Sequence, residues 1–286
     1  MTGDSVLLLG GTGFIGTALA GRLNLEKKSF HSLGSRDVER LEHVLPQCST
    51  VLHLASATTP GSSASQPEME LGNLALTLRL LDLLKRQPQT HLIFFSSGGT
   101  VYGNAERMPI TEDFPIAPLS NHGAGKASQE AFCRAARAQG SAVTILRPSN
   151  VYGPGQTMRQ GFGLIRTMLE HVRAGTLLEV WGDGENIRDF IYIDDIVEAS
   201  MRLINLPQDS GSYNIGSAVG FSINQVKGIV EASCGKKLQT IYRPGRGIDV
   251  RSVVLDNSRL KARLGWQPSV GLADGVARTW EWLQQP

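Results

Sequence analysis

Glycines near the N-terminus have the spacing that phosphate binding requires. The segment GGTGFIG at 10–16 follows the short apolar run Val6–Leu9. In such a turn the first glycine allows a tight bend, the second lets the backbone approach a pyrophosphate, and the third lets the next helix pack closely on the strand. The start of that helix presents free N–H groups and a positive dipole end to an anion. The pattern predicts a dinucleotide site, with a plain strand–helix turn as the alternative, and the residues expected to contact the cofactor here are Gly10, Gly13, Phe14, Ile15 and Gly16.

The end of the second strand, Phe30–Leu33, is the place that selects between nicotinamide dinucleotides. In a Rossmann unit an Asp or Glu there bonds the adenine ribose, whereas an Arg accommodates a 2′-phosphate. Gly34 occupies this position, and Ser35 and Arg36 follow it. A hydroxyl and a guanidinium suit a phosphate, so the segment favours NADP over NAD. The alternative is a solvated turn in which Asp37 caps the next helix.

Hydroxyl side chains follow the strand His91–Ser97. Because polar groups at the carboxyl ends of parallel strands face the ligand crevice, Ser96, Ser97 and Thr100 are placed for chemistry. The alternative is turn formation, which serine and threonine also favour. Lys126 begins the helix expected over Gly125–Gln139, where a positive charge is unfavourable, so it is either solvated or held for a ligand.

Alternating apolar strands and helices must position these side chains. They predict an α/β fold, a Rossmann doubly wound parallel sheet with a smaller C-terminal α/β lobe. The expected domains are 1–155, with 187–215 returning to it, and a substrate lobe formed by 156–186 and 216–286. The strands expected in the first domain are Val6–Leu9, Phe30–Leu33, Thr50–Ala55, His91–Ser97 and Val143–Arg147, and Thr58–Pro67 and Asn150–Gly155 are expected to be loops.

Bulk composition narrows the class of protein. The 286 residues carry 28 Lys+Arg and 26 Asp+Glu, a net charge of +2 with no long run of either sign, so nothing points to nucleic acid. Cys48, Cys133 and Cys234 stand far apart, as expected of reduced thiols, and no metal site is predicted. No apolar stretch approaches the length of a membrane span. We therefore expect a soluble cytoplasmic protein.

The motifs along the chain resemble those of the extended short-chain dehydrogenase/reductases, in their NAD(P)-dependent sugar-nucleotide epimerase/dehydratase group, of which UDP-glucose 4-epimerase is one example. The resemblance spans the whole chain. It is carried by GGTGFIG at 10–16, VLHLAS at 51–56, Asn73, SSGGTVYG at 96–103, LRPSNVYGPG at 146–155, GDGENIRDFIYIDDI at 182–196, NIGS at 214–217, Arg246 with Asp249, and LGWQP at 264–268.

The resemblance implies roles for residues at matching positions. Arg188 and Arg246 would contact the diphosphate of a nucleotide sugar, most simply a UDP-sugar, and Asn150 would lie beside the sugar. Lys126 would bind the nicotinamide ribose, and helices 71–86 and 125–139 would pair with a second copy in a homodimer. Further positions that would line the cofactor are Leu54, Ala55, Ser56, Asn73, Ser96 and Pro148.

Departures from the family pattern fall on its catalytic residues. The family has tyrosine four residues before the helix lysine, and this chain has His122 there, with Gly125 in place of the usual serine. The family's Ser/Thr partner falls on Gly98. A further departure is a shorter segment between the glycine-loop helix and Thr50–Ala55. This segment has one clear strand, where relatives usually have two.

These departures leave three interpretations. In the first, His122 replaces the tyrosine as acid and base, Lys126 assists, and Thr100 or Ser97 supplies the missing hydroxyl, since imidazole titrates near neutral pH. Imidazole is, however, shorter than phenol by roughly 2 Å, and a misplacement of about 1 Å can cost ~10²-fold in rate. In the second, the acid/base group comes from elsewhere. In the third, the protein binds cofactor and nucleotide sugar without catalysis.

Overall fold

The computed structural model describes residues 3–34, 37–158, 162–206, 208–245 and 250–285. The chain forms two compact units. The first consists of residues 1–97, 120–147 and 196–213, and the second of 98–119, 148–195 and 214–286. The segment 98–119 therefore groups with the second unit, although it lies inside the range 1–155 expected for the first domain.

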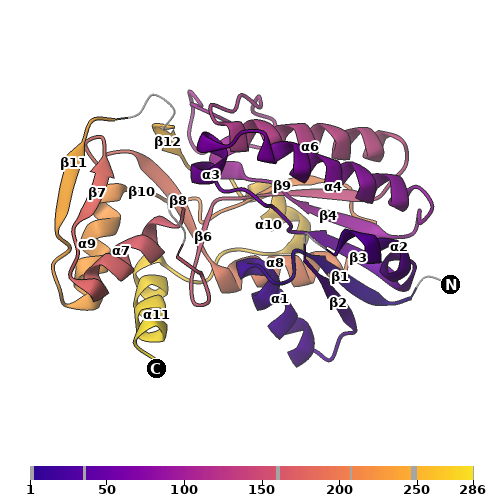
Figure 1. Ribbon diagram of the computed structural model, residues 1–286, viewed down its shortest axis with the longest axis horizontal. Helices are drawn as coiled ribbons and strands as arrows, with labels where there is room; N and C mark the ends of the chain where they lie inside the picture. The colour runs from indigo at the N-terminus through magenta and orange to yellow at the C-terminus, as the bar shows by residue number, and fades with distance from the viewer. Residues whose placement is uncertain (1–2, 35–36, 159–161, 207, 246–249, 286) are drawn as a thin grey trace. The chain divides into compact units, whose positions relative to one another are not determined.

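The first unit is built on a parallel sheet (Figure 1). The strand order is β2-β1-β3-β4-β5-β9, and each of the pairs β1–β2, β1–β3, β3–β4 and β4–β5 is parallel. The strands are β1 (Ser5–Leu9), β2 (Phe30–Leu33), β3 (Cys48–His53), β4 (His91–Phe95), β5 (Val143–Pro148) and β9 (Ser212–Ile215). The predicted Rossmann-type fold is confirmed. From β1 the chain adds β2 on one side of the sheet, and from β3 it adds β4 and β5 on the other side. The strand order therefore reverses between β1 and β3, and a ligand is expected where these two strands end.

Helices cover both faces of this sheet (Figure 1). On one face α4 packs against α6, and on the other α1 and α8 are joined by the ion pair of Arg22 with Glu198. The helices are α1 (Phe14–Leu25), α2 (Leu41–Val44), α3 (Pro60–Ser65), α4 (Met69–Leu84), α6 (Asn121–Ala138) and α8 (Ile193–Ile204), and single 3₁₀ turns η1 (Val38–Arg40) and η2 (Leu45–Gln47) flank α2.

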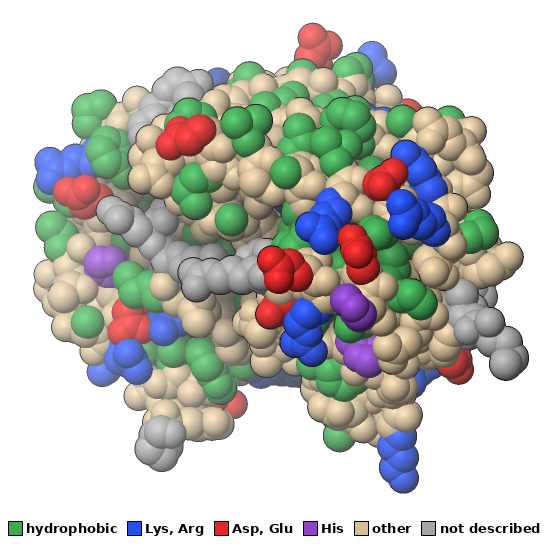
Figure 2. Space-filling model, turned by 45° about the vertical axis from the view of Figure 1, so that its right-hand side comes forward, with side chains coloured by type: hydrophobic (Ala, Val, Ile, Leu, Met, Phe, Trp, Pro, Cys, Tyr) green, Lys and Arg blue, Asp and Glu red, His purple; other side chains and the backbone are tan. Residues whose placement is uncertain are grey.

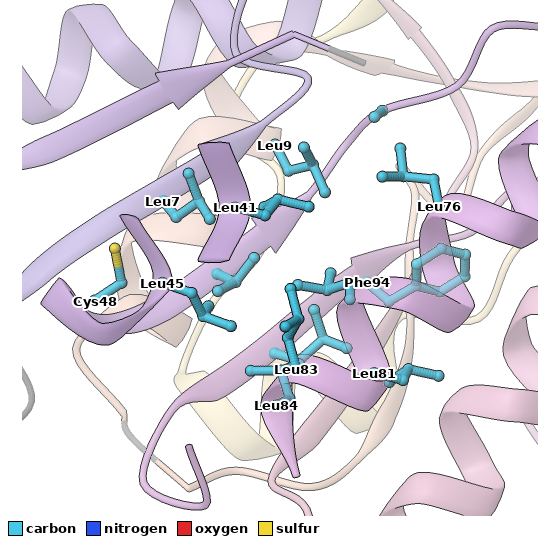
Figure 3. Close-up of a cluster of buried hydrophobic side chains, with 14 of the residues drawn as sticks. Leu7, Leu9, Leu41, Leu45, Cys48, Leu76, Leu81, Leu83, Leu84 and Phe94 are labelled. Carbon is cyan, nitrogen blue, oxygen red and sulfur yellow. The ribbon is translucent and has the colours of Figure 1, made fainter. Parts of the chain in front are cut away.

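Apolar strand residues form the core of the first unit. Figure 3 shows Leu7 and Leu9 of β1 beside Leu41, with Phe94 of β4 near Leu81 of α4. Strands buried on both faces read as continuous apolar runs, which is why the sequence revealed them. Burial of each such leucine contributes roughly 1.5–3 kcal/mol.

The second unit holds smaller sheets. Strand β8 (Ile187–Tyr192) pairs with β6 (Asn150–Tyr152), β10 (Gly220–Ser222) and β12 (Ser252–Val253), and β7 (Leu178–Trp181) pairs in parallel with β11 (Thr240–Arg243). Its helices are α5 (Gly98–Val101), α7 (Leu164–Ala174), α9 (Ile223–Cys234), α10 (Ser258–Leu264) and α11 (Leu272–Gln284). Segments 58–67 and 150–155, expected to be loops, contain helix α3 and strand β6. Among the described residues, no helix is long and apolar enough to cross a membrane.

Candidate functional site

The glycine turn lies between the end of β1 and the start of α1. Gly10 has φ +96°, and a Cβ there would come within 2.5 Å of the Ala55 backbone nitrogen. A Cβ on Gly16 would come within 2.5 Å of the Gly10 carbonyl oxygen. Backbone packing therefore demands glycine at both positions. A Cβ on Gly13 would meet only the Gly10 oxygen, at 3.3 Å, so the protein leaves more space beside Gly13 than beside Gly10 and Gly16.

Helix α1 begins with its backbone amides free of a side-chain cap. Its N-cap residue is Gly13, and no side-chain hydrogen bond caps it among the described residues. Phe14 and Ile15 occupy the first turn, where amides and the helix dipole attract an anion. The neighbouring strand end brings Leu54, whose amide donates to the Leu9 carbonyl at 2.8 Å. These residues fit the pyrophosphate of a dinucleotide.

The loop after β3 is held by Asn73 of α4. The Asn73 carbonyl oxygen Oδ1 accepts the Ala57 amide at 2.8 Å, and its Nδ2 donates to Thr58 Oγ1 and to Glu70 Oε2, each at 2.9 Å. Ser56 Oγ donates to the Thr58 carbonyl at 3.1 Å. Asn73, expected beside the cofactor, thus fixes the backbone that follows Ala55. Ser35 and Arg36 lie outside the described residues.

His122 lies in the first turn of α6 and is buried. Ser120 caps this helix by accepting the Gly123 amide at 3.1 Å. The His122 Nδ1 atom lies 3.2 Å from Thr58 Oγ1 and 3.3 Å from Glu70 Oε1. The two paired side chains of His122 and Glu70 are 9% and 11% exposed. The structure therefore brings His122 and Asn73 into one polar cluster with Glu70 and Thr58, and sequence reasoning missed the last two.

Electrostatics within this cluster keep Glu70 ionised. Burial raises its pKa, but hydrogen bonds from His122, Asn73, Thr58 and Ser63 outweigh burial and lower the pKa to about 2. The carboxylate can therefore only accept hydrogen bonds at neutral pH.

Lys126 lies one turn further along α6, and its side chain points into the unit. Its Nζ donates to the Phe95 carbonyl at 2.9 Å and lies 5.1 Å from the centre of the Phe94 ring. Burial lowers the pKa of Lys126 to about 8, against the opposing attraction of Glu70. The lysine is therefore held by the protein rather than solvated, so the first of the two alternatives that the sequence left open is wrong.

Ser96, at the end of β4, belongs to a buried charge network. Its Oγ donates to Glu130 Oε1 at 2.5 Å. Arg147 of β5 donates to both carboxylate oxygens of Glu130, Nε at 2.9 Å and NH2 at 2.8 Å. Glu130 is fully buried, and Arg134 adds a further bond at 2.8 Å. The Ser96 hydroxyl therefore points to Glu130, while Ser97 is partly exposed at the same strand end.

The remaining expected site residues belong to the second unit. Thr100 lies in α5 and Pro148 ends β5. Asn150 of β6 donates from Nδ2 to the Asp189 carbonyl at 2.8 Å, and a Cβ on Gly99 would lie 4.0 Å from that same nitrogen. Arg188 of β8 donates to the carbonyls of Ile187 and Arg251. Arg246 lies outside the described residues.

Asp189, beside Arg188, is a structural anchor. Its carboxylate accepts the Ser217 amide and hydroxyl, both at 2.8 Å, and the Leu255 amide at 3.1 Å. Burial raises the pKa of Asp189. This aspartate ties β8 to two loops of the second unit and so fixes the strand that carries Arg188. No group of side chains suited to a metal ion occurs within the described ranges.

Comparison with known proteins identifies the family. The model of the NAD dependent epimerase/dehydratase family matches residues 6–216, more than half of the chain. This chain belongs to that family. The resemblance drawn from the sequence motifs is thereby confirmed.

Three relatives illustrate the likeness of this family member to characterised proteins. UDP-glucose 4-epimerase of Mycolicibacterium smegmatis is 31% identical over 236 residues, which cover 82% of this chain and 75% of the relative. The crystal structure of UDP-glucose 4-epimerase from Thermotoga maritima with UDP-glucose is 29% identical, with a TM-score of 0.90 and 98% of both chains covered. The Thermus thermophilus UDP-glucose 4-epimerase in complex with NAD is 27% identical, with a TM-score of 0.91 and coverage of 98% and 99%.

Proposed function

We propose that this chain is an NAD(P)-dependent enzyme that epimerises or otherwise oxidises and reduces a nucleotide sugar, with His122 as its acid/base group. The observation that carries the proposal is the buried position of His122, four residues before Lys126, with its ring held through Nδ1. Histidine can take and return a proton near neutral pH. We assign to its Nε2 the exchange of a proton with a sugar hydroxyl.

The dinucleotide would lie along the glycine turn and the start of α1. When bound, the nicotinamide accepts or returns a hydride at the sugar carbon. Lys126, whose pKa of about 8 leaves it largely protonated at pH 7, would donate hydrogen bonds to the ribose beside that ring. Ser35 and Arg36 favour NADP over NAD, because a hydroxyl and a guanidinium suit a 2′-phosphate.

The substrate is proposed to be a UDP-sugar. Relatives that are UDP-glucose 4-epimerases, one of them seen with UDP-glucose, support this class. Arg188 and Arg246 are proposed to bind the diphosphate, and Asn150 the sugar. Thr100 or Ser97 would supply the hydroxyl that Gly98 lacks.

A second candidate is binding without turnover. It is favoured by the absence of a hydroxyl at Gly98 and Gly125 and by the shorter reach of imidazole relative to phenol. In that case the same residues would hold cofactor and nucleotide sugar but exchange no proton.

Turnover with a matched pair of histidine variants separates the two candidates. The protein is denatured to identify the released nucleotide, and UDP-sugars are then screened for conversion by ¹H NMR. We expect a nicotinamide dinucleotide to be released and a UDP-sugar to be converted. His122→Gln should lower kcat by roughly 10²–10⁴-fold while sugar binding persists. The exposed His43→Gln is the control and should leave kcat unchanged. Tight binding of UDP-sugars with no conversion by the unaltered protein would establish the second candidate.

Helices α4 and α6 are proposed to pair with a second copy, as expected for helices 71–86 and 125–139. These helices pack against each other and expose apolar side chains, Leu71 at 69%, Leu78 at 39% and Phe132 at 43%. Figure 2 shows hydrophobic side chains gathered in the upper part of the molecule, the level at which α4 and α6 lie in Figure 1. Pairing would remove this apolar surface from water.

A further inference from the structure

Glu70 and His122 form a largely buried carboxylate–imidazole pair that joins α4 to α6. The two residues are 52 positions apart in the chain, and Oε1 of Glu70 lies 3.3 Å from Nδ1 of His122. The other carboxylate oxygen, Oε2, accepts the Asn73 amide at 2.9 Å. Each oxygen of this carboxylate therefore has its own partner.

The pair favours one of the two imidazole nitrogens as the carrier of the proton. An ionised carboxylate is only an acceptor, so Nδ1 is the donor in its bond to Glu70. Thr58 Oγ1 lies 3.2 Å from the same nitrogen, and because the Thr58 hydroxyl itself bonds Glu70, its oxygen is left to accept from Nδ1. The neutral ring then has its lone pair on Nε2. A carboxylate that binds one ring nitrogen is a common way to fix the tautomer and orientation of a histidine.

Gly125 provides the space that the carboxylate occupies. A Cβ built on Gly125 would come within 2.5 Å of Glu70 Oε2 and 2.9 Å of its carboxyl carbon. A side chain at this position would therefore push the Glu70 carboxylate away. Among the described residues, the charged group in contact with His122 is Glu70 of α4, and Lys126, one turn along α6, attracts this same carboxylate.

We propose that Glu70 is the positioning residue of the catalytic centre, holding His122 in its Nδ1–H tautomer so that Nε2 is the nitrogen that exchanges protons with substrate. The proposal rests on the proposed function of His122. It adds a residue to which the family resemblance assigns no role.

The substitution Glu70→Gln inverts this arrangement. Asn73 Nδ2 is a donor, so the oxygen of the introduced amide would face Asn73 and its NH₂ group would face His122. Nδ1 would then meet a donor and become an acceptor, which moves the proton to Nε2. We expect the unaltered protein to show a protonated Nδ1 and the variant a protonated Nε2, measured by ¹⁵N NMR of the imidazole at a pH where the ring is neutral. Glu68→Gln, an exposed glutamate beside the same helix, is the matched control and should keep the Nδ1–H tautomer.

Kinetics provide the second readout. Glu70→Gln should lower kcat by about 10–100-fold with KM little changed, and Glu68→Gln should not. Gly125→Ser, which displaces the carboxylate, should lower the share of the Nδ1–H tautomer in a chain whose Glu70 is intact. An Nε2–H ring in the unaltered protein, or an unchanged tautomer in Glu70→Gln, would overturn the proposal. If the tautomer changes as expected but no variant or parent converts a nucleotide sugar, the positioning role stands and the catalytic function fails.

Discussion

The buried pair of Glu130 and Arg147, near the strand end that carries Ser96, yields a quantitative prediction of the free energy of unfolding. We consider Arg147→Met, which keeps the approximate length of the side chain and removes its charge. Glu130 is fully buried, and its two oxygens accept bonds at 2.9 and 2.8 Å from Arg147. Burial raises the pKa of Glu130, but the bonds and charge of Arg147 outweigh it and hold the pKa below its usual value.

The magnitude follows from what remains around the carboxylate. Without Arg147, the Glu130 charge retains Ser96 and Arg134, and the Arg134 side chain is 41% exposed. Removing one partner of a buried ion pair costs about 3–5 kcal/mol, whereas removing a solvent-screened partner costs about 0–1 kcal/mol. Arg147→Met should therefore lower the free energy of unfolding by about 3–5 kcal/mol, and Arg134→Met by at most about 1 kcal/mol.

Urea unfolding followed by tryptophan fluorescence measures the free energy of unfolding of each variant and of the unaltered protein. The double variant Glu130→Met/Arg147→Met supplies the decisive comparison. It removes both charges, so it should be more stable than Arg147→Met alone, because the cost comes from an uncompensated charge rather than from lost volume. Equal losses for Arg147→Met and Arg134→Met, or a double variant less stable than Arg147→Met, would refute this reasoning.

Further predictions concern the cofactor, the assembly and acid stability. NADP should bind more tightly than NAD, and Arg36→Ala should weaken NADP binding by about tenfold with no effect on NAD, measured by fluorescence titration. Light scattering at micromolar concentration should give the mass of a dimer, and a Leu71→Glu/Leu78→Glu variant that of a monomer, because charges would enter the apolar face. Burial lowers the pKa of His53 to about 3 and of His91 to about 4, below the ordinary histidine value of 6.5. As the pH falls below 6.5, both side chains therefore stay neutral in the folded chain but bind protons in the unfolded chain. Stability present above pH 6.5 should thus be lost toward pH 4, by up to about 1.4 kcal/mol per pH unit for each histidine, and His53→Gln should flatten the profile of unfolding free energy against pH.

The sequence predicted the central sheet well because its strands are buried on both faces. The run Val6–Leu9 and the observed strand Ser5–Leu9 differ by one residue, and the helix expected at 71–86 spans Met69–Leu84. Short elements were missed where their residues have the composition of a loop. Pro60–Ser65 has the composition of a loop, yet Thr59 and Ser62 form a capping box that begins a helix there.

The candidate site was only partly predictable, because its partners come from distant parts of the chain. The motif position identified His122, but Thr58 and Glu70 lie 64 and 52 residues away, and no local spacing connects them to it. One signal was present. Glu70 precedes Asn73 by three residues, so the two share a helix face, as their hydrogen bond shows. For Ser96 the position was predicted but the partner was not, because a place at a strand end does not indicate the buried Glu130 to which the hydroxyl donates.

The departures from the family pattern on α6 are linked through Glu70. A side chain at Gly125 would displace the carboxylate that binds His122, so the contact of Glu70 with the imidazole at 122 requires glycine at 125. A phenol has one oxygen and no second ring atom to anchor, whereas imidazole can be held at Nδ1 and act at Nε2. The carboxylate therefore gives the shorter side chain a fixed orientation, which is what a proton-exchanging group needs when small misplacements are costly. The cluster of Glu70, Gly125 and His122 therefore supports the proposal that His122, held by Glu70, is the acid/base group.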